Sequence, residues 1–193
     1  MGRVLLDISI SLDGFIARQD DDPGPIHDWF FTGDVQNPDN PVFRTAPESA
    51  GQIEAALSET GAIISGRRTY DLVDGWGGNH PVTGVPVFVV THAPPASVPE
   101  GATQFAFADG VEVAVEQARA AAGERNVVVM GGVSIARQCL EAGLLDELSI
   151  HVTPVLLGRG IPLFGDLDRE VTLEQTAVTP APGVTHLRYR VVR

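Results

Sequence analysis

The chain has 193 residues, of which 44% are hydrophobic and 20% charged, and its formal net charge at pH 7 is −12. This composition is ordinary for a globular protein, and the length suffices for one domain with a sizeable core. No apolar run approaches the roughly 20 residues of a membrane-spanning helix, and an acidic surface repels nucleic acid and anionic membranes. We therefore expect a small-molecule ligand, with no nucleic-acid or membrane partner.

The charged and sulfur-containing residues narrow the chemistry further. All 13 positively charged side chains are arginines, so a phosphate-bearing ligand must be met by arginines or by backbone N–H groups at helix starts. Cys139 is the only cysteine, which excludes an internal disulfide and a cysteine-based zinc site. The three consecutive aspartates at 20–22 are interpreted as solvated, and we expect no metal.

The N-terminal third begins with a β-rich run over Val4–Ile10, which predicts a first strand. The short apolar stretches around it contain polar residues and show no secretory signal, so we expect a cytoplasmic protein. Residues 18–46 are rich in Pro, Gly, Asp and Asn around an apolar group at 29–31, which predicts a long loop that is either a functional lid or a disordered linker.

Helical and strand patterns alternate through the rest of the chain. The expected helices are Glu48–Thr60, Thr69–Val73, Val111–Ala122 and Val133–Ala142. The expected strands are Ala62–Ser65, Val85–Val90, Gln104–Ala108, Val127–Met130 and Glu147–Leu157, followed by an alternating hairpin around Val171–Gln175 and Leu187–Val191. Strands separated by helices imply right-handed parallel crossovers. We therefore predict a single domain over residues 1–193 with a three-layer α/β/α fold: a mixed, mostly parallel, twisted sheet with an antiparallel C-terminal hairpin.

The first of two notable strand-to-helix junctions contains Gly66, Arg67, Arg68 and Thr69. Helix-start N–H groups and the threonine can hold a pyrophosphate, and a guanidinium suits a phosphate monoester. A solvated arginine pair beside a helix start is an equally good interpretation of these residues alone.

The second junction runs from Val127 through Gly131 and Gly132 into a helix that begins Val133-Ser134-Ile135. It differs from the dinucleotide fingerprint G-x-G-x-x-G, and tight strand-to-helix turns often use a glycine pair. Two such junctions in one sheet support each other, because a dinucleotide needs contacts along an extended path at the strands' carboxyl ends.

Several segments together resemble the dihydrofolate reductase superfamily. They are Ser11-Leu12-Asp13-Gly14-Phe15-Ile16-Ala17, Gly66-Arg67-Arg68-Thr69-Tyr70, Val89-Val90-Thr91 and Met130-Gly131-Gly132. The phrase Leu156-Leu157-Gly158-Arg159-Gly160-Ile161-Pro162-Leu163-Phe164 resembles the riboflavin-biosynthesis reductase branch, the C-terminal domain of the bacterial bifunctional deaminase-reductase. The zinc deaminase signature itself is missing from the sequence.

The resemblance implies that the chain binds NADPH. It places Arg67 at the 2′-phosphate, Arg68 and Thr69 at the pyrophosphate, and Thr91 with His92 at the adenosine end. The remaining implied cofactor residues border the pyrophosphate, ribose or nicotinamide: Ser9, Ile16, Ala17, Gly66, Gly131, Gly132, Val133, Ser134 and Ile135.

The proton donor is the point where this chain departs from dihydrofolate reductases, which place a helix carboxylate against the pterin. No acid here stands clearly in that role; Asp28 lies beside the corresponding stretch, and Asp7 shares the Ser9 face of the first strand. Asp7 is either a pocket residue or a residue on a wet face. We rank it above Asp28 as the catalytic acid, because a strand fixes a side chain better than a loop does.

Three aromatic residues are candidates for the substrate side: Trp29, Trp76 and Phe164. Trp76 is equally well interpreted as an anchor for its glycine-rich loop. His151 and His186 lie on expected strands, where structural roles are commoner than ligation.

The sequence thus predicts an NADPH-dependent reductase that transfers hydride to a pterin, a ribosylaminopyrimidine or a related heterocycle. The alternatives are a nucleotide-binding protein without turnover and a flavin-binding reductase. By analogy with riboflavin-type reductases, which pair through their late region, we also expect a homodimer.

Overall fold

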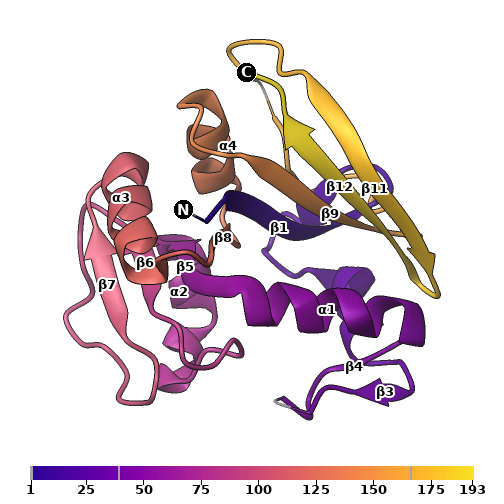
Figure 1. Cartoon of the computed structure of the whole chain (residues 1–193), viewed down its shortest axis with the longest axis horizontal. Coiled ribbons are helices and arrows are strands. Elements are labelled where there is room, and N and C mark those ends of the chain that lie inside the picture. The colour runs from indigo at the N-terminus through magenta and orange to yellow at the C-terminus, as the bar shows by residue number, and fades with distance from the viewer. Residues whose placement is uncertain (1, 39, 166) are drawn as a thin grey trace. The chain divides into compact units, whose positions relative to one another are not determined.

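The computed structural model describes residues 2–38, 40–165 and 167–193, and Figure 1 shows its helices and strands. An eight-stranded sheet has the order β11-β12-β9-β1-β8-β5-β6-β7, and two small two-stranded sheets pair β10 with β2 and β3 with β4. The large sheet is mixed and mostly parallel, with helices packed on it and an antiparallel pair at its C-terminal end. The expected fold class is confirmed.

The chain divides into two compact units. Unit 1 comprises the N-terminal residues through Leu6 and the segment Glu59–Glu147. Unit 2 comprises Asp7–Ser58 and Leu148–Arg193. Strand β1 (Val4–Ser11) contributes residues to both units, and so does β9 (Glu147–Thr153).

Unit 1 is a parallel α/β arrangement. Its strands are the start of β1, β5 (Thr60–Gly66), β6 (Val87–Val90), β7 (Phe105–Ala108) and β8 (Asn126–Val129), and every pairing among them is parallel. Its helices are α2 (Arg67–Leu72), η2 (Asp74–Gly78), α3 (Val111–Ala122) and α4 (Val133–Glu141). Strand β5 is buried along its whole length, as expected of a central parallel strand that is covered on both faces.

Different elements cover the two faces of the unit 1 sheet. On one face Ile63, Val87 and Val89 pack with Tyr70 of α2, and Trp76 of η2 lies against this cluster. Helix α3 packs against β5, β6, β7 and β8, and its buried stripe contains Val111, Ala114, Val115, Ala118 and Ala122. This 3.6-residue spacing of small apolar side chains lets the helix lie close to the sheet.

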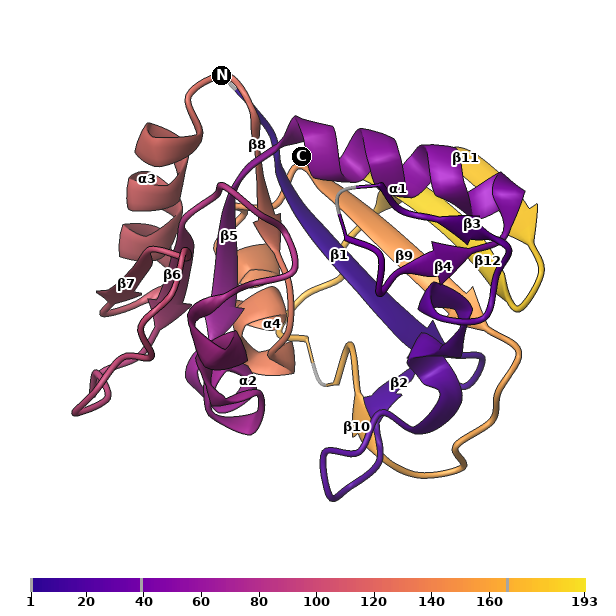
Figure 2. The same ribbon diagram turned by 90° about the horizontal axis from the view of Figure 1, so that it is seen from below.

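Unit 2 is built around an antiparallel hairpin of β11 (Leu173–Ala181) and β12 (Val184–Val191), drawn in yellow in Figure 1. Pro182 and Gly183 connect the two strands, and Gly183 has φ +77, which suits the third position of a type II turn. The unit also contains β2 (Phe15–Ala17), η1 (Gly24–Phe30), β3 (Val35–Gln36), β4 (Arg44–Thr45), α1 (Pro47–Glu59) and β10 (Ile161–Pro162). Figure 2 shows β2 and β10 side by side, where Ile161 pairs with Ala17.

The expected elements are present, with shifts at their ends that have local causes. Strand β9 ends at Thr153 instead of Leu157, because Pro154 follows and cannot donate a backbone hydrogen bond. The region 18–46, expected to be one long loop, contains η1 and the short strands β3 and β4. Helix α1 runs directly into β5, so Thr60 begins a strand rather than ending a helix.

Among the helices of the described residues, none combines the length and the apolar character that crossing a membrane requires.

Candidate active site

In unit 1 the two strand-to-helix junctions lie next to each other because β5 and β8 are paired. Ile63 pairs with Val128 and Ile64 with Val129, and the pairing continues through a 2.9 Å hydrogen bond from Met130 N to Ile64 O. Both strands run in the same direction, so Gly66 leads into α2 and Gly132 into α4 at the same edge of the sheet. Figure 2 shows α2 and α4 at the end of the molecule to which β5 points. The sequence expectation that the two junctions form one region is met within this unit.

Glycines permit this close approach. Gly131 and Gly132 have φ values of +69 and +87, which a residue with a Cβ rarely adopts. A Cβ added at Gly131 would lie 2.7 Å from Thr69 Cγ2, and one at Gly132 would lie 3.4 Å from Gly66 Cα. The glycines of each junction therefore leave room for the backbone and side chains of the other.

The N-terminus of α4 presents backbone donors at this edge. Gly132 precedes the helix and its carbonyl accepts hydrogen bonds from the N–H groups of Ile135 (3.0 Å) and Ala136 (3.1 Å). Val133 is half-buried and Ser134 is exposed, and the Ser134 hydroxyl accepts a 2.8 Å hydrogen bond from Gln138 Nε2. The first N–H groups of a helix have no partner within it and carry a partial positive charge, so they favour an anion.

Arg67 sits at the start of α2 with a partly exposed side chain. Its Nε donates to both carboxylate oxygens of Asp71, at 2.7 and 2.9 Å, and its Nη1 donates to the carbonyl of Ala93. A guanidinium has five N–H donors, so these contacts orient Arg67 without using its whole capacity. Arg68 follows it on the same helix.

The end of β6 reaches the same neighbourhood. Thr91 Oγ1 bonds both to Ala93 O and to Ala93 N, each at 3.1 Å, and so shapes the segment that receives Arg67. His92 is exposed and its Nδ1 pairs with Asp109. A cavity of about 400 Å³ lies beside α2, but its lining includes Asp71 and Asp74, so it does not suit an anion.

Trp76 is partly buried and packs against the core cluster of unit 1. Its ring stands 4.5 Å from the His80 ring and is stacked at 6.4 Å on Phe105. Residues 74–77 all have positive φ, so a bulky side chain here needs strong anchoring. This packing favours the anchor interpretation of Trp76.

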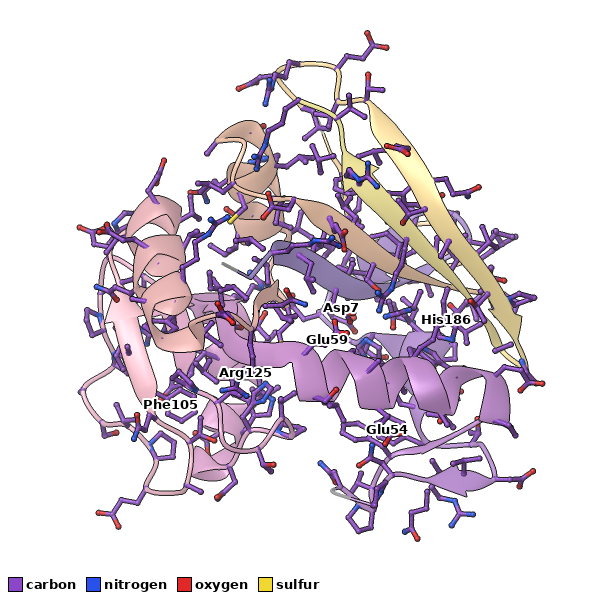
Figure 3. The ribbon with its side chains drawn as sticks, viewed as in Figure 1. Asp7, Glu54, Glu59, Phe105, Arg125 and His186 are labelled. Atoms are coloured by element: carbon purple, nitrogen blue, oxygen red, sulfur yellow. The ribbon has the colours of Figure 1, made fainter. Side chains whose placement is uncertain are left out.

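In unit 2 the first candidate acid belongs to a chain of polar side chains. Asp7 Oδ1 lies 3.3 Å from His151 Nε2, His151 Nδ1 lies 2.7 Å from His186 Nδ1, and His186 Nε2 lies 2.8 Å from Ser49 Oγ. The two histidines and Ser49 are buried, while 26% of the Asp7 side chain is exposed. The strands β1, β9 and β12 and the helix α1 each contribute one residue, and Figure 3 labels Asp7 and His186.

The protonation states of Asp7 and His186 depend on their burial and on the polar and charged groups around them. Burial acts to raise the pKa of Asp7, but the attraction and hydrogen bond of His151, with Ser149 and Arg188, lower it below its ordinary value. Burial, together with His151 and Arg188, lowers the pKa of His186 to about 4, and Asp7 opposes this shift. Near neutral pH Asp7 is therefore ionised and His186 is uncharged.

Trp29 lies over this polar chain. Its Nε1 donates a 3.1 Å hydrogen bond to Ser9 Oγ, and its ring centroid lies 5.1 Å from that of His151 and 5.0 Å from that of His186. Ser9 and Trp29 are both buried. Trp29, Ser9 and Asp7 are three candidates that the structure brings into one cluster.

The other unit 2 candidates lie on β2, after β10, and on η1. Ile16 and Ala17 form β2, and Phe164, which is 37% exposed, follows the buried Leu163. Leu163 N donates to Gly14 O at 3.0 Å, which ties this segment to the turn after β1. Asp28 is exposed, and its carbonyl ends η1 by accepting from Phe31 N.

A model of the RibD C-terminal domain family matches residues 3–187. The chain belongs to this family. Among curated relatives, the uncharacterized protein YwjB of Bacillus subtilis (strain 168) is 29% identical over 173 residues, which is 89% of this chain and 87% of the relative.

Solved structures agree with this RibD-type assignment. A protein from Shewanella sp. PV-4 provisionally assigned to riboflavin biosynthesis is 27% identical, with a TM-score of 0.72 and 99% of both chains covered. Dihydrofolate reductase from Enterococcus faecalis, solved with NADP(H) and RAB-propyl, shares the fold: its TM-score is 0.62 at 14% identity, with 100% of this chain and 98% of the other covered. The first of these neighbours is thus described as a riboflavin biosynthesis protein, and the second shows the shared fold.

For this RibD-type domain, sequence reasoning located the junction residues but missed Ser49 and the pairing of His151 with His186. His151 ends a run of buried residues on β9, and His186 is at an inward position of the alternating start of β12. Burial alone does not reveal a partner 35 residues away, and Ser49 looks like an ordinary residue near a helix start.

Proposed function

We propose that this chain is an NADPH-dependent reductase that acts on a small heterocyclic substrate, such as a pterin or a ribosylaminopyrimidine. The observation that carries the proposal is the meeting of the β5–α2 and β8–α4 junctions in unit 1, where Gly66, Thr69, Gly131 and Gly132 contact one another. Family membership and the NADP(H) bound by a protein of the same fold support it.

The donor set in unit 1 fits the phosphates of a dinucleotide. Helix-start N–H groups of α4 and the Thr69 hydroxyl suit a pyrophosphate, and Arg67 suits a 2′-phosphate. Arg68, Thr91, His92, Val133, Ser134 and Ile135 complete the proposed cofactor set of this unit. The Asp71 carboxylate accepts hydrogen bonds from Arg67 Nε, and these bonds fix the orientation of the guanidinium group before a phosphate binds.

In unit 2 we assign Ser9, Ile16 and Ala17 to the nicotinamide and Trp29 and Phe164 to the substrate; the packing of Trp76 makes it the weakest substrate candidate. NADPH, when bound, supplies the hydride. Reducing a C=N or C=O bond leaves an electron pair on the heteroatom, which needs a proton. Asp7 is the acid that we assign to this face, because it is fixed on a strand and hydrogen-bonded, whereas Asp28 is exposed at the end of η1.

The test combines binding and turnover. We expect the chain to bind NADPH and to oxidise it steadily when a reducible pterin or pyrimidine is added. Binding without oxidation across such a panel would instead indicate a nucleotide-binding protein. A yellow preparation with flavin absorbance would indicate a flavin-binding reductase.

We also propose a homodimer formed by the late part of the chain. Strand β11 is the edge of the large sheet and is exposed along most of its length, and Leu156 is 71% exposed. Long exposed edge strands are usually paired or protected. Light scattering at micromolar concentration should give twice the mass of one chain; the mass of a single chain would contradict the proposal.

A further inference from the structure

Three consecutive polar contacts link Asp7, His151, His186 and Ser49, whereas a single hydrogen bond would be enough to stabilise the fold locally. It places two imidazole rings in direct contact, and every ring nitrogen has a partner: Asp7 and His186 for His151, and His151 and Ser49 for His186. Buried imidazoles are costly unless hydrogen-bonded, so the satisfied pair is a stable arrangement. The two rings lie at 79° to each other with centroids 4.8 Å apart, beneath Trp29.

We propose that His151, oriented by His186 and Ser49, stores a proton for Asp7, so that the Asp7–His151 pair is the proton source of the reaction. The inference rests on the proposed reductase function and deepens it. Within it, Asp7 is the group that meets the substrate, and His151, His186 and Ser49 are positioning residues that act through Asp7.

The hydrogen bonds can form in two states: a loaded state, in which His151 carries the stored proton, and an unloaded state, in which His151 is neutral. When His151 is protonated, its Nε2–H donates to the Asp7 carboxylate and its Nδ1–H donates to His186 Nδ1, which leaves the His186 Nε2–H to donate to Ser49 Oγ. When His151 is neutral, its Nδ1–H still donates to His186. A serine hydroxyl both donates and accepts, so Ser49 fits either tautomer of His186.

The hydrogen bonds place His151 between the Asp7 carboxylate and the uncharged His186 ring. Besides the two members of the Asp7–His151 pair, three charged or titratable side chains interact with the pair or with His186: His27 on η1, and His186 and Arg188 on β12. Within the pair, Asp7 carries the negative charge and lies against His151 Nε2. Burial lowers the pKa of His186 to about 4 and also lowers the pKa of His27, so both are neutral acceptors or spectators near pH 7.

The polar chain opens to solvent at one end. Ser49 is 1% exposed and His186 is 2% exposed, whereas the Asp7 side chain is 26% exposed. A proton therefore enters and leaves through Asp7. Because the pKa of Asp7 is lowered, its carboxylate alone would have no proton to give near neutral pH.

In the proposed step one proton moves from His151 Nε2 to the Asp7 carboxylate and from Asp7 to the substrate heteroatom, which receives the electron pair displaced by the hydride. The products are the reduced substrate, oxidised cofactor, ionised Asp7 and neutral His151. The Nε2 lone pair then faces the carboxylate, an arrangement that favours uptake of a proton from solvent and reloads the pair.

The test uses His186 because it touches neither Asp7 nor the proposed ligands. In His186→Leu the His151 imidazolium loses an acceptor for its Nδ1–H, so the alkaline limb of the kcat profile should move about one pH unit lower, a loss of about tenfold above that limb. His186→Asn, whose side-chain oxygen can take the place of Nδ1, should restore the limb. NADPH affinity should be unchanged in both. If the kcat profile of His186→Leu keeps its alkaline limb at the wild-type pH and kcat is only lower by the same factor at every pH, the proposal is overturned.

A second readout needs neither cofactor nor substrate, so it separates failure of this inference from failure of the proposed function. In the ligand-free chain, nitrogen NMR of labelled histidines follows the protonation of His151 against pH. We expect His151 to lose its proton at lower pH in His186→Leu than in wild type, with recovery in His186→Asn. Identical titration of His151 in all three proteins would show that the two rings are uncoupled, and the proposal would fail even if turnover were normal.

Discussion

The candidate regions of the two units are built from different kinds of polar groups. The candidate region of unit 1 is formed by backbone at strand ends, with glycines at the contacts and arginines beside them. The candidate region of unit 2 is formed by side chains from β1, β9, β12 and α1 that meet in a buried hydrogen-bonded chain. Arginines stay charged and backbone N–H groups keep their protons across the physiological range, whereas an imidazole can gain or lose a proton within it. We therefore assign binding of the phosphates to unit 1 and pH-dependent proton handling to unit 2.

The largest expected effect is in unit 1, at Gly132. Its φ of +87 is strained for any residue with a Cβ, and an added Cβ would already lie 3.4 Å from Gly66 Cα, so the extra methyl groups of valine would crowd the junction. Gly132→Val should therefore reduce NADPH binding below detection by calorimetry while circular dichroism shows the fold retained. Gly143 is the matched control, because it also has positive φ, at +68, but nothing lies within 4 Å of an added Cβ. Equal NADPH affinity in Gly132→Val and Gly143→Val would exclude this junction from the cofactor site.

Next in size is a pH effect on stability to which both units contribute. Burial lowers the pKa of His80 in unit 1 to about 4, as it does for His186 in unit 2, while an unfolded histidine titrates near 6.5. The unfolded chain takes up these protons first, so stability that is present above pH 6.5 is lost as the pH falls toward 4. The loss should be about 3 kcal/mol for each histidine.

Denaturant unfolding at a series of pH values checks this effect unit by unit. His80→Asn keeps an acceptor for the Val82 N–H, which donates to His80 Nδ1 at 3.0 Å, and removes the titrating ring. In unit 2, His186→Asn likewise removes a titrating ring and keeps a polar side chain in its place. Each variant should flatten the decline between pH 6.5 and 4 by about the contribution of one histidine. A decline as steep as in wild type would show that the ring in question titrates normally in the folded chain.

A smaller effect, about 100-fold, is expected on turnover from the acid of unit 2. Asp7→Asn removes the carboxylate but leaves a hydrogen-bonding group of the same shape beside His151, so kcat should fall by about 10²-fold while NADPH affinity is kept. Asp28→Asn is the comparison, since Asp28 is exposed, and it should turn over nearly normally. If both variants turn over like wild type, the chain donates no carboxylate and the proton comes from solvent or substrate.

What the sequence revealed about the molecule follows the same division. Two short segments have the order strand, glycine, helix, which indicates anion binding; they contain Gly66, Thr69, Gly131 and Gly132. The candidate region of unit 1 could therefore be located in advance. The pairing of β5 with β8 then brought the two segments together, as parallel crossovers imply.

Unit 2 was harder because its residues are far apart along the chain. His151 and His186 are separated by 35 positions and Ser49 and His186 by 137, and no local pattern links them. The sequence did predict that Asp7 and Ser9 share one face of the first strand, and it made Trp29 a candidate for the substrate side. It could not show that Trp29 bonds to Ser9 or that Asp7 meets an imidazole, because those contacts depend on strand register across the sheet.

The most direct measurement of the central claim is calorimetry of NADPH and NADH with wild type and Arg67→Ala. A charge-assisted hydrogen bond contributes roughly 1.5–3 kcal/mol, so the variant should bind NADPH about 10- to 150-fold more weakly than wild type. NADH, which lacks the 2′-phosphate, should bind both proteins equally. Equal losses for the two cofactors, or no NADPH binding by wild type, would contradict the assignment of unit 1 as the NADPH site.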